Sequence, residues 1–208
     1  MRGPLKSFGL LSLLVVGVGL LVWMVVRDAG SEPYAIDPGA WSGWTIVPGR
    51  PEDPWILAAQ PPPQLSSALL AQINSKRAAH VTAPGRMLLP LVLRREYEEG
   101  LQGVHSVDTL ARFARDAGLE NATFDPVCLA HKRDARGELV FVLLESPVFG
   151  QFRQDVIPAF PEHAGTGFYD SGALRPLLVV DDSAGDNGRW WPIAVDEAND
   201  CEARVVTK

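Results

Sequence analysis

The chain has 208 residues, of which 47% are hydrophobic and 21% are charged. Residues 27–208 hold all 25 acidic residues but only 17 of the 19 basic ones, so this part carries a net charge of −8. That excess argues against binding of nucleic acid or anionic lipid headgroups through bulk charge. The remaining length of about 180 residues is enough for one domain with its own core.

Residues 8–26 read FGLLSLLVVGVGLLVWMVV, without a charge. A helix of this length covers about 28 Å, close to the thickness of the hydrocarbon core of a bilayer. The stretch is longer than the apolar region of a secretory signal peptide and ends without a small-x-small cleavage site, so we expect an uncleaved signal anchor. Because Arg2 and Lys6 precede it, residues 1–7 should be cytoplasmic and the C-terminal part extracytoplasmic.

Residues 27–63 are rich in proline and glycine, and we expect them to form a membrane-proximal segment without long elements. Short extended pieces fit at residues 44–47 and 55–59. The three prolines at 61–63 are typical of a polyproline II connector. The regular domain is therefore expected to span residues 64–208.

This domain shows helical and strand periodicities in turn. Helices are expected at 64–76, 95–101, 107–117 and from 147 to about 157. Strands are expected at 87–94, 126–132, 138–145, 176–181, 189–195 and 201–207. The pattern predicts an α+β fold, with one mostly antiparallel sheet and about three main helices.

Cys128 and Cys201 are the two cysteines. In an oxidising, extracytoplasmic environment an even pair indicates a disulfide bond, and two separate buried thiols are the alternative. A shared metal ion is disfavoured, because His131 is the nearest histidine and one Cys-x-x-His pair is a weak signal. We expect no cofactor and no metal ion.

Tryptophan supplies the candidate binding surface, formed by Trp41, Trp44, Trp55, Trp190 and Trp191. Exposed indoles can stack on sugars, anchor a partner protein or lie at the level of lipid headgroups. The alternative, which we favour, is that these side chains seal the proline-rich segment onto the sheet.

Other polar patterns are weaker. Residues 181–187 collect oxygen ligands for calcium, but they miss the EF-hand spacing and a tight hairpin turn explains them better. Serines lack the Gly-x-Ser-x-Gly setting of a nucleophile elbow. His80, His105, His131 and His163 do not lie at metal-binding spacing.

Three functional hypotheses follow. The first is a single-pass membrane protein, anchored in the bilayer by residues 8–26, whose exterior domain binds another envelope protein as an accessory or assembly factor. The second is an anchored hydrolase that combines distant residues such as His163, Asp170 and Ser171. The third is a carbohydrate-binding module that uses Trp41, Trp44 or Trp190.

The 15 arginines against 4 lysines, with abundant Ala, Gly and Pro, indicate a GC-rich bacterial genome. No catalytic residue can be assigned from the sequence, and the balance leans towards binding.

Overall fold

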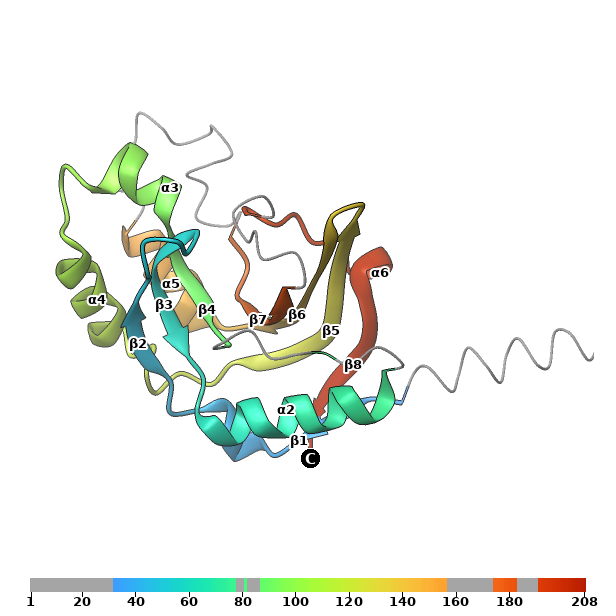
Figure 1. Ribbon diagram of the computed structural model, residues 1–208. Helices are drawn as coiled ribbons and strands as arrows, with labels where there is room; N and C mark the ends of the chain where they lie inside the picture. The colour runs from blue at the N-terminus through green and yellow to red at the C-terminus, as the bar shows by residue number, and fades with distance from the viewer. Residues whose placement is uncertain (1–31, 78–80, 82–86, 157–173, 183–190) are drawn as a thin grey trace, which may run out of the picture. The chain divides into compact units, whose positions relative to one another are not determined.

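The computed structural model describes residues 32–77, 81, 87–156, 174–182 and 191–208 (Figure 1). Pro33–Lys208 form one compact unit. Among the residues that the structure describes, no helix is long and apolar enough to cross a bilayer. The span expected at residues 8–26 lies outside this part of the chain and stays a prediction.

The fold is α+β, as predicted, but its strands form two sheets rather than one. The five-stranded sheet has the order β1-β8-β5-β6-β7, and the three-stranded sheet has the order β2-β3-β4. The strands are β1 (Tyr34–Ile36), β2 (Thr45–Pro48), β3 (Trp55–Gln60), β4 (Leu89–Leu93), β5 (Asp125–Asp134), β6 (Gly137–Glu145), β7 (Leu177–Asp182) and β8 (Cys201–Thr207). All neighbouring strands are antiparallel except β1 and β8. An isolated bridge joins the sheets, where the Val179 N–H donates to the Leu88 carbonyl at 2.9 Å.

Three longer helices match the expected ones: α2 (Pro63–Lys76), α4 (Val107–Asp116) and α5 (Pro147–Val156). The helix expected at 95–101 is divided into α3 (Arg94–Glu96) and the π-helical turn η2 (Tyr97–Leu101). Two further short elements are the 3₁₀ turn η1 (Pro38–Trp41) and α6 (Glu197–Asp200). The strand expected at 189–195 is wrong over its described part, because residues 191–195 form no strand. Pro192 lacks the N–H that a ladder requires.

The segment at 27–63 contributes more regular structure than its composition indicates. Both expected extended pieces are confirmed as β2 and β3, which pair with each other. Upstream, β1 lies parallel to β8, and the Lys208 N–H donates to the Ile36 carbonyl at 3.1 Å. Residues near the start of the compact unit are therefore held by the last strand of the chain.

The core follows the two faces of the five-stranded sheet. On one face, alternate residues of β6 such as Val140 and Val142 belong to a large cluster that includes residues of α2, α4 and α5. On the other face, Leu139, Phe141 and Leu143 form a smaller cluster with residues of β5 and β7. Strand β6, expected at 138–145, is buried from Leu139 to Leu144 and has β5 and β7 as neighbours.

The predicted disulfide between Cys128 and Cys201 is confirmed, with a Cα–Cα distance of 5.7 Å. It links β5 to the first residue of β8 across a sequence separation of 73. The two strands also pair directly, so the bond reinforces a contact between segments that are distant in sequence.

Candidate functional site

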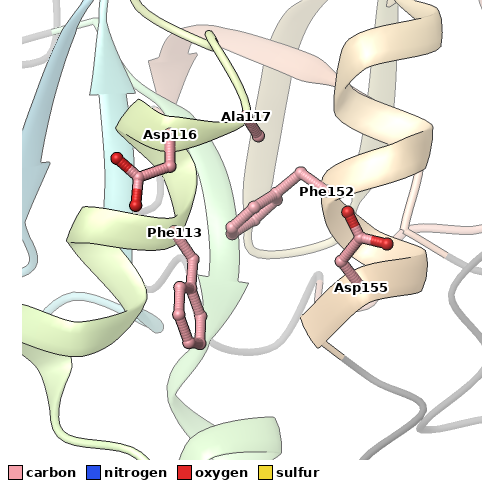
Figure 2. A pocket seen from close by; sticks show the side chains of 5 residues that line it. All are labelled: Phe113, Asp116, Ala117, Phe152 and Asp155. Atoms are coloured by element: carbon pink, nitrogen blue, oxygen red, sulfur yellow. The ribbon is translucent and has the colours of Figure 1, made fainter.

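A cleft of about 320 Å³ lies between α4 and α5 (Figure 2). Its walls are formed by Phe113, Asp116 and Ala117 from α4 and the residue that follows it, and by Phe152 and Asp155 from α5. In Figure 2 the ring of Phe152 extends from α5 towards α4. Each helix thus contributes a phenylalanine and an aspartate three residues later, a spacing that places both side chains on one side of a helix.

The local sequence of α4 explains its contribution. The Ser106 hydroxyl accepts a hydrogen bond from the Thr109 N–H at 3.2 Å and caps the first turn. Leu110 and Ala114 are fully buried at a spacing of four residues, so Phe113 and Asp116 lie on a flank of the helix. Gly118 follows the helix with a positive φ of 82° and leaves Ala117 at the C-terminal end of α4.

The second wall is fixed by a buried ion pair. Arg153 of α5 and Glu96 of α3 are 1% and 2% exposed. The Arg153 guanidinium donates to both carboxylate oxygens of Glu96, at 2.9 and 2.5 Å, and to the Leu91 carbonyl at 3.2 Å. Glu96 also accepts from the Leu93 N–H at 2.8 Å. These bonds attach α5 to β4 and α3, and so they position Phe152 and Asp155.

Two exposed carboxylates give the cleft a negative character. Asp155 accepts a hydrogen bond from the Gln151 amide at 2.8 Å. Within the described part of the chain, neither Asp116 nor Asp155 forms an ion pair with a basic side chain. Both lie in the last turn of their helices, where the helix dipole adds partial negative charge. The arrangement suits a cation attached to an apolar group.

A second polar cluster surrounds Arg77, at the C-terminal end of α2. Its guanidinium lies 3.1 Å from Glu138 of β6 and 3.3 Å from Glu202 of β8. Burial raises the pKa of Glu138, but the charges of Arg77 and Arg133 outweigh it and hold this pKa below its usual value. Because every charge in the cluster faces a partner of opposite sign, we interpret it as a structural connection between α2 and the sheet.

The end of β7 lies near this cluster. Burial, followed by the charges of Asp182 and Glu138, raises the pKa of Asp181 above its usual value. Asp181 and Asp182 close the strand, whereas residues 183–187 of the expected calcium loop lie outside the described residues. No group of three His, Cys, Asp or Glu side chains in the described ranges could hold a metal ion.

The candidate tryptophan surface is mostly part of the core. Trp41, Trp44 and Trp55 are 0%, 2% and 3% exposed. The Trp44 indole N–H donates to the Trp41 carbonyl at 2.8 Å, and Trp55 packs edge-on against Trp191 with ring centroids 5.9 Å apart. The first three indoles therefore offer no free face to a sugar, and their positions agree with the packing alternative. Trp190 lies outside the described residues.

The remaining sequence candidates are not brought together in the described structure. His80, His163, Asp170 and Ser171 lie outside the described residues. His105 contacts Phe113 edge-on, with centroids 5.3 Å apart, and His131 lies 3.7 Å from Glu202. None of the five cleft residues was a sequence candidate. The repeated Phe-x-x-Asp pattern at the ends of two helices was the available signal, but only the fold makes the two copies neighbours.

Comparison with protein-family models, with curated proteins and with solved structures gives no match.

Proposed function

We propose that this chain is a membrane-anchored, extracytoplasmic binding protein of the bacterial envelope, an accessory or assembly factor that receives its partner at the cleft between α4 and α5. The cleft is the observation that carries the binding role. It combines two phenylalanines with two carboxylates that lack ion-pair partners within the described part of the chain. A small number of polar groups around an apolar surface is the usual composition of a binding site.

Two further observations support the location. The uncharged stretch at 8–26 has the length of a membrane span. The disulfide between Cys128 and Cys201 is a bond typical of proteins that fold outside the cytoplasm.

Protease treatment of intact spheroplasts tests the location. Residues 27–208 should be degraded while a cytoplasmic control protein survives. Maleimide labelling provides an independent measurement, because Cys128 and Cys201 should react only after denaturation and reduction. Full protection from protease, or two free thiols in the protein isolated with its disulfides preserved, would contradict the proposed location.

Site-specific photo-cross-linking in living cells tests the binding role. Benzoylphenylalanine at Phe113 keeps an aromatic ring in the cleft, and the same residue at the exposed position Thr123 is the matched control. A discrete adduct is expected from position 113 and not from position 123. Equal adducts from both positions, or none from position 113, would count against the cleft as the binding site.

A further inference from the structure

We propose that the cleft between α4 and α5 binds an arginine side chain presented by a partner protein. This inference rests on the proposed function, since it names the chemistry of the partner at the same site. A volume of about 320 Å³ is at the lower limit for ligand pockets, so it fits one side chain of a larger partner better than a whole drug-sized molecule.

The walls match the two parts of an arginine. Phe113 is partly exposed and provides apolar surface for its methylene stem and an aromatic face on which the flat guanidinium can stack. Phe152 is only 1% exposed, so it contributes mainly to the core at this wall of the cleft. Asp116 and Asp155 are acceptors for its N–H groups, and carboxylate–guanidinium hydrogen bonds are the strongest of this type. Lysine is a poorer match, because its compact, strongly hydrated ammonium does not stack in the same way.

The electrostatics of the chain's own residues leave a place for an incoming cation. Asp155 is bonded only to the neutral amide of Gln151, and Asp116 has no hydrogen bond or ion pair among the described residues. Among the described arginines near these carboxylates, Arg153 is bound to Glu96 and Arg115 lies 3.7 Å from Glu120, while the exposed Arg112, four residues before Asp116 on α4, forms no ion pair with it. Both carboxylates stand at helix C-termini, where an anion is unfavourable and a bound cation is favoured.

The test uses the full-length protein in detergent micelles and ligand-detected NMR titrations. The probe is N-acetyl-L-arginine methylamide, which resembles an arginine within a peptide chain. Its citrulline analogue has nearly the same shape without the charge, and free L-arginine carries additional terminal charges. We expect the arginine probe to bind with a millimolar Kd, more tightly than the citrulline analogue. Added salt should weaken this binding.

Four variants locate the binding. Asp116→Asn and Asp155→Asn should each raise the Kd of the arginine probe by up to about fivefold, which is the range expected for a solvent-exposed ion pair. Ala117→Phe should abolish binding by filling the cleft at a position with ordinary helical φ and ψ. The double variant Asp125→Asn, Glu145→Gln removes the same charge as both aspartate changes from exposed positions that do not line the cleft, and should bind like the wild type. Circular dichroism checks that each variant is folded.

The inference is overturned if the citrulline analogue binds equally well, if Ala117→Phe retains full binding, or if the probe does not bind. Binding of free L-arginine alone would also overturn it, because the cleft would then accept a small molecule instead of a partner's side chain. These outcomes leave the proposed location intact, since that depends on the protease and labelling results. Conversely, if residues 27–208 were found in the cytoplasm and the protein still bound the arginine probe, the proposed location would be refuted and the assignment of arginine as the ligand would stand.

Discussion

The buried pair of Arg153 and Glu96 gives the sharpest stability prediction. Replacing Arg153 by Met removes the guanidinium and keeps a side chain of comparable length. Glu96 then retains the Leu93 N–H as a hydrogen-bond donor but loses both of its bonds to Arg153. The carboxylate would be a buried charge without a counterion, at an exposure of only 2%. Breaking a buried ion pair in this way costs about 3–5 kcal/mol.

That loss is large against the total stability of a domain, typically about 5–15 kcal/mol. For a domain of this size, a change of 1 kcal/mol shifts Tm by about 2–4 °C, so Arg153→Met should lower Tm by roughly 6–20 °C. Glu96→Gln alone should also destabilise, because it leaves the guanidinium charge buried. The double variant leaves no buried charge and keeps an acceptor for the Leu93 N–H. It should therefore lose less free energy of unfolding than the two single variants together.

Urea denaturation followed by tryptophan fluorescence measures these free energies, and circular dichroism gives Tm. Arg112→Met is the matched control, because Arg112 is exposed and forms no ion pair among the described residues; it should change stability by less than about 0.5 kcal/mol. The reasoning is refuted if Arg153→Met costs less than about 1 kcal/mol, or if the effects of the two single variants simply add.

Three further measurements test other parts of the fold. The disulfide closes a long loop, so Cys128→Ala and Cys201→Ala should each lower the free energy of unfolding by about 4 kcal/mol. Because both variants remove the same bond, additive losses in the double variant would show that the effect does not come from the disulfide. Because the pKa of Glu138 lies below its usual value, its contribution is present above the unfolded-state pKa of about 4.3 and is lost as the pH falls through the folded-state pKa. Glu138→Gln should thus be less stable than the wild type at neutral pH and approach it in acid, and a pH-independent difference in urea midpoints would count against this account. At Gly49 an added Cβ would lie 2.0 Å from a backbone carbonyl of β3, so Gly49→Ala should lower the free energy of unfolding by at least about 2 kcal/mol. Gly103→Ala is the control, because no neighbouring atom lies within 4 Å of its added Cβ, and it should be nearly neutral. Equal urea midpoints for the two variants would refute the steric argument.

Local sequence patterns predicted much of the secondary structure. The helix α2 was indicated by Leu65, Leu69 and Ile73, which recur every four residues and are all buried. The central strand β6 was indicated by its unbroken apolar run, because a strand that is buried on both faces needs apolar side chains on both. The disulfide was predicted from the count of cysteines together with the expected compartment.

The division into two sheets was not predictable in the same way. Pairing of β1 with β8 joins segments that are far apart in the sequence, and the bridge between Leu88, which precedes β4, and Val179 of β7 connects the two sheets. Hydrophobic periodicity shows which face of a strand is buried but does not identify its neighbour. The expected single sheet was wrong for this reason.

The cleft was not predictable from the sequence for the same reason. Phe113 and Asp116 belong to one helix, and Phe152 and Asp155 belong to another, so helical spacing fixes the geometry within each pair. Whether the pairs face each other depends on how α5 is held, and that is set in part by Arg153 binding Glu96 from 57 positions earlier in the chain. The sequence by itself therefore determined the local elements, the acidic character of residues 27–208 and the pairing of the two cysteines, because these depend on composition and short-range spacing. Only the tertiary structure decided that two helix ends with matching residues meet at one cleft and that three tryptophans are buried, because both depend on long-range packing.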